Sequence, residues 1–325
     1  MTKILLTGGA GFIGSHVAEA IIRTQPDVQL TVLDKMTYAA DFRNLAQVLS
    51  HRHGRLVVGD ICDLDVCRQL TQGVDLVVNL AAESHVDNSF GNSLHFTHTN
   101  VYGTHTLMEA CRINKVPRIL HVSTDEVYGD IISGSFDERS PLNPTNPYAA
   151  SKAAAEMVIR GYISSFGLPV IMVRGNNIYG TRQFPEKIIP KFCMQLHRGK
   201  QLTVHGDGSN VRSYLFVEDF ASAVLLLVEK AVIGEVYNVG TTEEYTNLQI
   251  ASMLCKLFAL NVKEQLSFVT DRPFNDRRYS ISCAKIHELG WTKKHALERE
   301  LPAIVAWYRE NAERYEDVKL DSNHT

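Results

Sequence analysis

The sequence predicts an α/β protein built on a doubly wound parallel sheet, with a smaller C-terminal lobe. Short apolar runs alternate with helical patterns over the first half of the chain, which is typical of strands joined by helical crossovers. Two of these runs, LVVNL at 76–80 and PVIMV at 169–173, are apolar at nearly every position. Such runs are typical of strands that are covered on both faces. After about residue 178 the pattern becomes irregular, which indicates a second lobe.

The strands of the first half are expected at Lys3–Thr7, Leu30–Asp34, Arg55–Val58, Leu76–Leu80, Arg118–Ser123 and Val170–Arg174. Helices are expected between them, including Gly14–Thr24, Thr99–Ile113 and Pro147–Ser165. Asn146 can cap the last helix, and Pro147 occupies its first turn, where a missing N–H does no harm. We expect residues 1–178 to form the main domain and residues 179–325 mainly the second lobe, with elements near 211–240 returning to the main sheet.

Composition and charge exclude several classes of partner and site. The 325 residues include 33 Lys and Arg and 36 Asp and Glu, so the chain lacks the basic excess that binds nucleic acid. No apolar run approaches the roughly 18 residues that cross a bilayer, and the first residues do not resemble a signal peptide. The six cysteines form no C-x-x-C pair. This spacing predicts a reducing, cytoplasmic location, and no metal site is expected.

A glycine-rich turn, TGGAGFIG at 7–14, follows the first expected strand and opens the first helix. Gly8, Gly11 and Gly14 fit a Rossmann-type turn, in which backbone N–H groups approach a pyrophosphate at a helix N-terminus. A purely structural turn is the alternative. Asp34 comes 20 residues after Gly14, where a carboxylate can accept both ribose hydroxyls of NAD and repel the 2′-phosphate of NADP. The neighbouring Lys35 keeps NADP as the alternative to NAD.

Asp60 and Ile61 follow the third expected strand and can reach the adenine edge of a dinucleotide. An N-cap or turn aspartate is the equal alternative for Asp60, because aspartate favours both positions.

Tyr148 and Lys152 are spaced i, i+4 in a predicted helix, so both lie on one helix face. A nearby cation lowers the pKa of a phenol, which would make Tyr148 a base near neutral pH. The alternative is a solvated helix face. The segment HVSTDEVYG at 121–129 places Asp125 and Glu126 at a strand end, where ligands bind in such sheets. Adjacent carboxylates are often turn residues, but together with the glycine turn they indicate acid–base chemistry.

With these motifs the chain resembles the extended short-chain dehydrogenase/reductase superfamily and, within it, the nucleotide-diphosphate-glucose 4,6-dehydratases, over about residues 3–310. The glycine turn and Tyr-x-x-x-Lys mark only the superfamily. The more specific stretches are STDEVYG (123–129), PTNPYAASK (144–152), NNIYGTRQFPEKIIP (176–190), HGDGSNVRSYLFVED (205–219) and DRPFNDRRY (271–279). Several of them look most like the UDP-glucose dehydratase half of eukaryotic rhamnose synthases, with the dTDP-glucose enzymes next. Bacterial dTDP-glucose enzymes typically have a histidine where Asn275 stands here.

The resemblance implies a redox-neutral dehydration with tightly bound NAD. Tyr148 takes the proton of the glucose 4-hydroxyl as the C4 hydride passes to NAD⁺, while Lys152 holds the cofactor ribose and Thr124 steadies the same oxygen. Glu126 then removes the C5 proton, and Asp125, kept protonated, protonates the departing 6-hydroxyl. The hydride returns to C6. Elimination next to a carbonyl needs both a base and an acid, and two neighbouring carboxyls can supply one of each.

The resemblance also implies the residues that contact cofactor and substrate. The cofactor residues are Gly8, Gly11, Phe12, Ile13, Gly14, Asp34, Lys35, Asp60, Ile61, Ala81, Ala82, Asn100, Tyr148 and Lys152. The substrate residues, for UDP-glucose or dTDP-glucose, are His85, Asn177, Lys187, Ile188, Thr203, His205, Arg212, Asn247, Arg272 and Asn275.

Some of these residues have simpler alternatives. Arg212 and Arg272 can clamp a diphosphate, because guanidinium groups match phosphate oxygens, but arginines are commonly surface residues. Lys187 can be a solvated helix start, and His85 can be a hydrogen-bonded structural histidine. Close packing would also explain Ala81 and Ala82.

Relatives also imply a homodimer, in which the helices at 99–113 and 147–165 of two subunits form a four-helix bundle. Two other functions remain open. A 4-epimerase or decarboxylase would form no 4-keto-6-deoxy product and would not need Asp125. A catalytically silent NAD-binding scaffold would not need the set Thr124, Asp125, Glu126, Tyr148 and Lys152, which is intact in this sequence.

Overall fold

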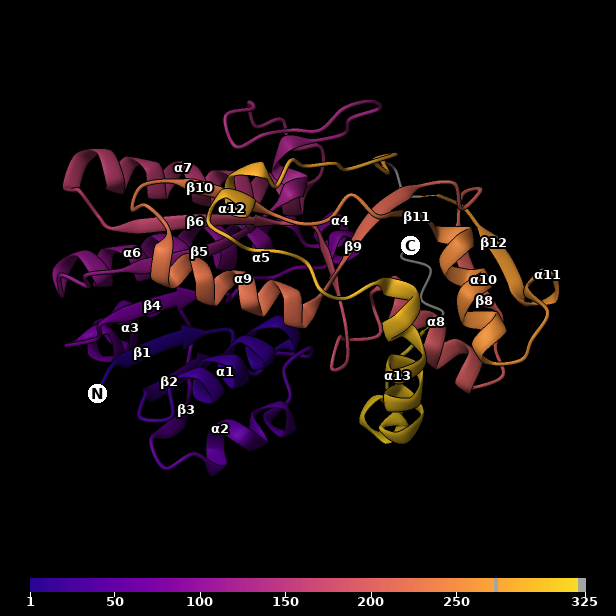
Figure 1. Ribbon diagram of the computed structural model, residues 1–325, viewed down its shortest axis with the longest axis horizontal. Coiled ribbons are helices and arrows are strands. Elements are labelled where there is room, and N and C mark those ends of the chain that lie inside the picture. The colour runs from indigo at the N-terminus through magenta and orange to yellow at the C-terminus, as the bar shows by residue number, and fades with distance from the viewer. Residues whose placement is uncertain (272–273, 321–325) are drawn as a thin grey trace.

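A seven-stranded parallel sheet forms the centre of the molecule (Figure 1). The computed structural model describes residues 1–271 and 274–320. The strands run in the order β10-β6-β5-β4-β1-β2-β3, and every neighbouring pair is parallel. Their bounds are β1 Lys3–Thr7, β2 Gln29–Asp34, β3 Gly54–Val58, β4 Leu76–Asn79, β5 Ile119–Thr124, β6 Val170–Gly175 and β10 Val236–Val239. The predicted fold class, a Rossmann-type doubly wound sheet with a smaller lobe, is confirmed.

Helices cover both faces of this sheet. One layer contains α1 (Phe12–Thr24), α2 (Ala46–Ser50), α9 (Val217–Lys230) and α12 (Ala284–Glu288), and the other contains α3 (Leu64–Thr71), α6 (Thr104–Ile113) and α7 (Pro147–Phe166). Because successive strand residues point to opposite faces, Leu6 packs in the first layer and Leu5 in the second. Leu5 and Leu6 are both fully buried, which explains the apolar runs of the sequence.

The helix α7 carries two predicted site residues and has well-defined ends. The Asn146 side chain accepts a hydrogen bond from the Ala149 backbone N–H at 2.8 Å, and Pro147 occupies the first turn, as predicted. The helix ends at Gly167, which adopts the left-handed conformation with φ +64°. The predicted helix at 99–113 begins with a π-helical segment, Thr97–Gly103, that leads into α6. Two short helices precede it, α4 (Val86–Gly91) and α5 (Ser93–Phe96).

The second lobe lies at one end of the molecule and has a core of its own (Figure 1). A three-stranded sheet contains β7 (Asn177–Tyr179), β9 (Val211–Phe216) and β11 (Glu244–Thr246), and a two-stranded sheet contains β8 (Leu202–His205) and β12 (Leu266–Val269). Its helices are α8 (Ile188–His197), α10 (Asn247–Leu257), α11 (Val262–Gln265) and α13 (Leu297–Glu310). In the part of the chain that the structure describes, no helix is long and apolar enough to cross a membrane.

The chain passes between the two lobes more often than the sequence predicted. Within the expected range 211–240, α9 packs on the main sheet and β10 joins it, while β9 pairs with β7 and β11 but contributes Leu215 to the main core. The segment around α12 also returns, because the Trp291 indole N–H donates to the Ser222 hydroxyl of α9 at 3.1 Å. Elements return to the main sheet within residues 211–240 and again around α12.

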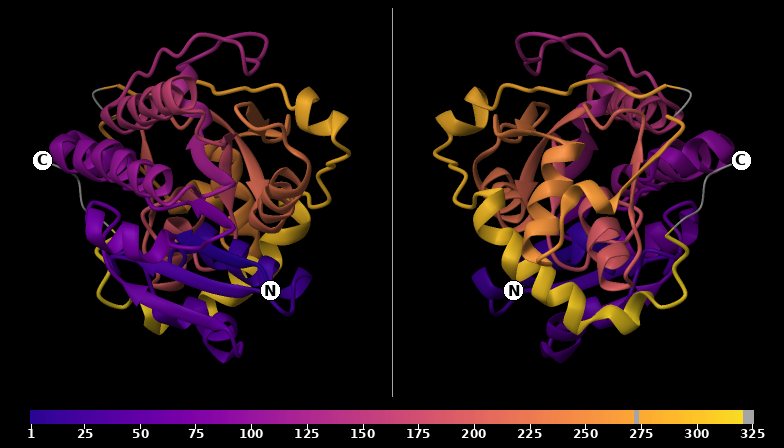
Figure 2. Two further views of the ribbon diagram at one scale, coloured as in Figure 1. Left: turned by 90° about the vertical axis from the view of Figure 1, so that its left-hand side faces the viewer. Right: turned by 90° about the vertical axis from the view of Figure 1, so that its right-hand side faces the viewer.

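A projecting loop between β5 and α7 connects the two lobes above the site. The middle of this loop stands out from the top of the molecule in Figures 1 and 2, whereas its ends, Gly129 and Asn146, are buried. Within this loop, the Ile131 N–H donates to the Arg278 carbonyl at 3.1 Å and the Phe136 N–H to the Ser280 carbonyl at 2.9 Å. These bonds hold the segment around Tyr279 close to the end of β5.

Candidate active site

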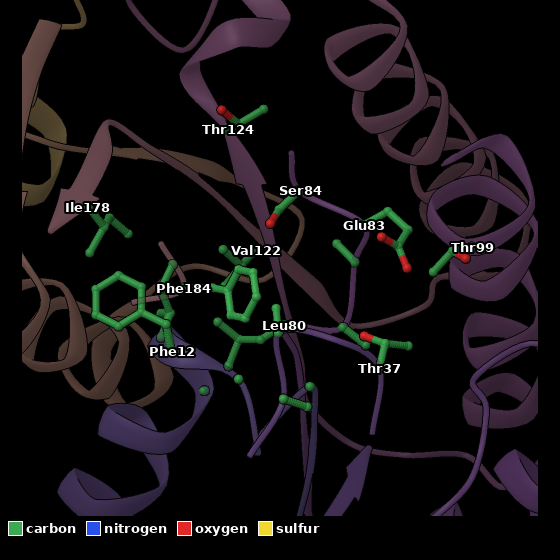
Figure 3. A pocket seen from close by; sticks show the side chains of 18 of the residues that line it. Phe12, Thr37, Leu80, Glu83, Ser84, Thr99, Val122, Thr124, Ile178 and Phe184 are labelled. Atoms are coloured by element: carbon green, nitrogen blue, oxygen red, sulfur yellow. The ribbon is translucent and has the colours of Figure 1, made fainter. Parts of the chain in front are cut away.

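A cavity of about 290 Å³ lies beyond the carboxyl ends of the central strands β1, β4 and β5. Figure 3 shows Phe12 and Ile178 on one side of this cavity, Glu83 and Thr99 on the other, and Thr124 at the end of β5. Parallel sheets of this type bind ligands at this edge. The cavity is therefore where the predicted site residues should meet.

The glycine turn forms one wall of the cavity. Gly8 has φ +71°, and a Cβ atom there would lie 2.7 Å from the Ala81 backbone. A Cβ on Gly14 would lie 2.1 Å from the Gly8 carbonyl oxygen, so this glycine lets α1 pack against the turn. Gly11 faces the cavity, and a Cβ there would meet only the Gly8 oxygen, at 3.4 Å. The space beside Gly11 at the α1 N-terminus therefore fits the pyrophosphate of a dinucleotide.

The residues predicted to contact the ribose and the adenine, Asp34, Lys35 and Asp60, follow or end the neighbouring strands β2 and β3. Buried Asp34 accepts hydrogen bonds from the Ala10 and Met36 N–H groups, both at 2.9 Å, and burial raises the pKa of its carboxyl. Lys35 Nζ lies 2.7 Å from Asp60 Oδ2. Asp60 also accepts from the Cys62 N–H at 2.9 Å, so it is a turn residue that lines the cavity. Because Asp60 compensates the charge of Lys35, this lysine gives little support to the NADP alternative.

The two adjacent carboxyls enter the cavity from a short 3-10 turn, Asp125–Tyr128, that follows β5. The Thr124 hydroxyl caps this turn by accepting from the Glu126 N–H at 3.3 Å. Asp125 is buried, and its Oδ2 accepts from Asn176 Nδ2 at 2.7 Å. Burial raises the pKa of Asp125 to about 7, and the Glu126 charge adds to the increase. Asp125 therefore keeps a large share of its proton near neutral pH.

Glu126 has different partners from Asp125. Its Oε2 accepts from Asn146 Nδ2 at 3.1 Å and lies 3.4 Å from the Tyr279 hydroxyl oxygen. Tyr279 donates to Asp276, which accepts from the Thr145 hydroxyl as well. This network fixes the second carboxyl of the pair from the second lobe and from the start of α7.

Tyr148 and Lys152 both line the cavity, but their interaction differs from the prediction. The Tyr148 hydroxyl is hydrogen-bonded to Thr124, and burial, followed by the Glu126 charge, raises the pKa of the phenol. Lys152 Nζ donates to the Val122 carbonyl at 2.7 Å, and burial lowers the pKa of the ammonium to about 8. The predicted lowering of the Tyr148 pKa is therefore wrong for the chain by itself, because burial and carboxylates dominate its surroundings.

A second cavity of about 150 Å³ adjoins the first and shares Glu126, Asn177, Glu186 and Lys187 with it. The predicted substrate residues that line this cavity are His85, Asn177, Lys187, Ile188, Thr203, His205, Arg212, Asn247 and Asn275. Arg272 lies outside the described residues. The Arg212 guanidinium lies 4.6 Å from the centre of the Tyr279 ring and donates to the Asp276 carbonyl at 2.9 Å. This packing directs a fixed positive charge into the second cavity.

Lys187 and His85 lie where the two cavities meet. Lys187 precedes α8, but its ammonium donates to the Ser84 carbonyl at 2.6 Å, so it crosses the junction between the lobes. His85 is buried, with ring nitrogens 3.6 Å from an Asp87 oxygen and 3.7 Å from a Glu186 oxygen. Lys187 therefore lines both cavities, whereas His85 lines the second one only.

Asn100 is the predicted cofactor residue that lies behind the cavity wall. Its Oδ1 accepts from the Glu83 N–H at 2.8 Å, and its Nδ2 donates to the Ser151 hydroxyl at 2.9 Å. Asn100 thus ties the Glu83 backbone to α7. The other predicted cofactor residues, Phe12, Ile13, Ile61, Ala81 and Ala82 among them, line the cavity itself.

Sequence reasoning missed several cavity residues, namely Glu83, Asn176, Gln183, Glu186 and Tyr279. Four of them lie within stretches that carry the family resemblance, namely NNIYG, QFPEK and DRRY, and Glu83 directly follows the predicted cofactor residue Ala82. Their position in the sequence was the signal that could have identified them. Within residues 1–271 and 274–320, no group of three or more His, Cys, Asp or Glu side chains could hold a metal ion.

Comparison with known proteins places this geometry in a family. The family model described as GDP-mannose 4,6 dehydratase matches residues 5–302. The chain belongs to the nucleotide-sugar 4,6-dehydratase family. The dTDP-glucose 4,6-dehydratase DesIV of Streptomyces venezuelae, solved with NAD and TYD bound, superposes with a TM-score of 0.95, at 42% identity and with coverage of 98% of this chain and 100% of that chain.

Two curated relatives add to this comparison. A trifunctional UDP-glucose 4,6-dehydratase/UDP-4-keto-6-deoxy-D-glucose 3,5-epimerase/UDP-4-keto-L-rhamnose-reductase of Arabidopsis thaliana is 48% identical over 97% of this chain. The chain spans about half of that relative, 48% of its length. The dTDP-D-glucose 4,6-dehydratase of Homo sapiens is 40% identical over 98% of this chain and 93% of its own length.

Proposed function

We propose that the chain is a nucleotide-diphosphate-glucose 4,6-dehydratase that keeps NAD bound through its reaction. The observation that carries this proposal is the pair of adjacent carboxyls on one cavity wall, close to the hydrogen-bonded Thr124 and Tyr148. Burial raises the pKa of Asp125 to about 7, so a substantial share of this group is protonated near neutral pH, which gives the site an acid beside Glu126. Water elimination needs such an acid and base together, whereas epimerisation or NAD binding alone does not.

The shape of the first cavity supports NAD as the cofactor. Gly8, Gly11 and Gly14 leave space for the pyrophosphate, Asp34 would accept the ribose hydroxyls, and Lys152 and Tyr148 line the far end. When bound, NAD supplies a hydride acceptor that can return the same hydride to the sugar. Lys35 is paired with Asp60, which favours NAD over NADP.

The proton transfers fall to three side chains, Tyr148, Glu126 and Asp125. Thr124 and Tyr148 would hold the sugar 4-hydroxyl, and Tyr148 would take its proton. Burial and the Glu126 charge oppose ionisation of Tyr148, so the phenolate must be stabilised when the site fills. Lys152 lies one helical turn from Tyr148 and can supply positive charge there.

After oxidation at C4, the new carbonyl acidifies the C5 proton. Glu126 would take this proton, and Asp125 would give its own to the departing 6-hydroxyl, so that one water molecule leaves. The two carboxyls have different neighbours, Asn146 and Tyr279 for Glu126 and Asn176 for Asp125. This difference is consistent with a base role for Glu126 and an acid role for Asp125. After the hydride returns to C6, a proton returned to C5 completes the 4-keto-6-deoxy product.

We propose UDP-glucose as the preferred substrate, with dTDP-glucose as the alternative. The identity is higher to the UDP-glucose relative, 48%, than to the human dTDP-glucose enzyme, 40%. Arg212 would bind the diphosphate in the second cavity, where its Nη2 donates to Asn275 Oδ1 at 3.3 Å.

The experiment that tests this function incubates the purified chain with UDP-glucose or dTDP-glucose and then adds alkali. A 4-keto-6-deoxy sugar absorbs near-ultraviolet light in base, whereas an epimer or a pentose does not. Deuterium placed at C4 should reappear at C6 of the product. Formation of an epimer, or loss of the deuterium to solvent, would contradict the proposal.

We propose further that two copies of the chain pair through α6, α7 and the segments that precede them. Exposed apolar side chains gather on these elements, including Leu94, Tyr102, Met157 and Phe166. Such patches mark protein–protein contacts. Met157→Glu should convert a dimer into a monomer in light scattering, and a wild-type chain that is monomeric at all concentrations would contradict the pairing.

The state of the cysteines bears on the proposed cytoplasmic location. All six cysteines are free thiols, and five of them are buried, which suits a reducing compartment. Imaging of a tagged chain in its source cell would test the location.

A further inference from the structure

Asn176 contacts one oxygen of Asp125 and Thr124 the other, and Asn176 was absent from the predicted site. It directly follows β6, is 5% exposed, and donates from Nδ2 to Asp125 Oδ2 at 2.7 Å. Its Oδ1 accepts from the Thr241 backbone N–H at 2.8 Å. A backbone N–H can only donate, so the amide oxygen must face Thr241 and the NH₂ group must face Asp125.

The backbone at the end of β10 forms a closely fitting socket for this amide. The Asn176 N–H donates to the Val239 carbonyl at 3.1 Å, so Asn176 is held through its main chain as well. A Cβ atom on Gly240 would lie 1.9 Å from Asn176 Oδ1. Any side chain at position 240 would therefore displace the Asn176 amide from its position.

We propose that Asn176, seated against Gly240, is a positioning residue that fixes which oxygen of Asp125 carries the transferable proton. This inference rests on the proposed dehydratase function. The Asn176 NH₂ group can only donate, and the carbonyl oxygen of a protonated carboxyl is a better acceptor than its hydroxyl oxygen, so Asn176 favours Oδ2 as the unprotonated oxygen. The proton then sits on Oδ1, 3.4 Å from the Thr124 hydroxyl, which donates to Oδ1 in this structure but, unlike the NH₂ group, can rotate to accept from it. Asp125 thus presents its proton on the side of Thr124 and Tyr148.

The groups that face Asp125 define the expected effect of removing Asn176. The charges around it are Glu126, which raises the Asp125 pKa, and Arg212, which lowers it, and Tyr148 and Cys283 are also close enough to interact electrostatically. The Asn176 hydrogen bond favours the ionised carboxylate. Its loss should therefore raise the Asp125 pKa and free the carboxyl to rotate.

The test compares Asn176→Ala and Gly240→Ala with the wild-type, NAD-loaded protein. The Asp125 carboxyl is followed by infrared difference spectroscopy, as the protonated C=O band that disappears in Asp125→Asn. We expect the titration midpoint of this band to rise by about one pH unit in Asn176→Ala and to move in the same direction in Gly240→Ala. The alkaline limb of the kcat–pH profile should shift with it, while kcat falls about ten-fold or more and KM changes little.

Asn238→Ala is the matched control, because Asn238 is a fully buried amide on β10 that accepts from the Tyr128 hydroxyl at 2.8 Å. It should lower the Tm without moving the Asp125 titration. An unmoved titration in Asn176→Ala, or an equal shift in Asn238→Ala, would overturn the inference. If the wild-type chain converts neither UDP-glucose nor dTDP-glucose, the proposed function fails, but the infrared titration still decides the role of Asn176.

Discussion

Arg174 lies in a buried network beneath the candidate active site and has no exposed surface. Its Nη2 lies 2.6 Å from Glu156 Oε2, and its Nε donates to Glu156 Oε1 at 3.0 Å. Its Nη1 donates to the Tyr128 hydroxyl at 2.6 Å. We expect Arg174→Met to break all of these contacts and to leave the Glu156 carboxylate buried without its cation.

The size of this effect follows from the burial of both partners, whose side chains are 0% exposed. Removing one member of a buried ion pair costs about 3–5 kcal/mol of unfolding free energy, because the remaining charge has no counterion. A chain of 325 residues has an unfolding entropy of about 0.7 kcal/mol/K, so Tm should fall by about 4–7 °C. Urea unfolding and scanning calorimetry measure the two quantities.

The double variant Arg174→Met with Glu156→Leu tests the reasoning behind this magnitude. If the uncompensated charge causes the loss, removing both charges should restore most of the stability, since apolar side chains of similar volume replace buried ion pairs at little cost. A double variant that loses as much stability as the sum of the two single variants would refute the explanation.

Three further predictions concern the site itself. Asp125→Asn should slow water loss about 10²–10⁴-fold while C4 oxidation survives, so NADH absorbance should accumulate in stopped-flow experiments; unaltered turnover would contradict the acid role. Because burial raises the Asp125 pKa to about 7, the folded protein binds this proton more tightly than the unfolded chain, and the contribution of this group to stability falls as pH rises from about 4 to about 7. Asp125→Asn should therefore remove that part of the pH dependence in urea titrations, and an unchanged profile would exclude this assignment. Gly14→Ala would place a Cβ 2.1 Å from the Gly8 oxygen and should weaken NAD binding in calorimetry, whereas Gly91→Ala, with no atom within 4 Å, should not.

Much of the main sheet could be predicted because local sequence determines it. Each strand expected in the first half lies within one or two residues of its observed bounds, since apolar runs covered on both faces have few alternatives. The glycine turn could also be predicted, because Gly8 and Gly14 are required by contacts that lie largely within the same short segment.

Contacts between distant segments could not be predicted in the same way. The partners of Asp125 and Glu126, Asn176 and Tyr279, come from 51 and 153 residues away along the chain, and no periodicity relates them. The direction of the Tyr148 pKa shift was wrong because helical spacing does not report burial or the nearby carboxylates. Asn100 was expected to contact the cofactor, but its contacts with Glu83 and Ser151 depend on how α7 packs.

The position of β10 limits how such a protein can be altered. This strand pairs with β6 as the outermost member of the main sheet, although it is translated after β7, α8, β8 and β9. A fragment that stops at residue 178 would lack this strand and the Thr241 N–H that orients Asn176. The second lobe therefore cannot be exchanged as a contiguous cassette to change the sugar nucleotide, and new specificity has to come from point substitutions or grafted loops within the intact chain.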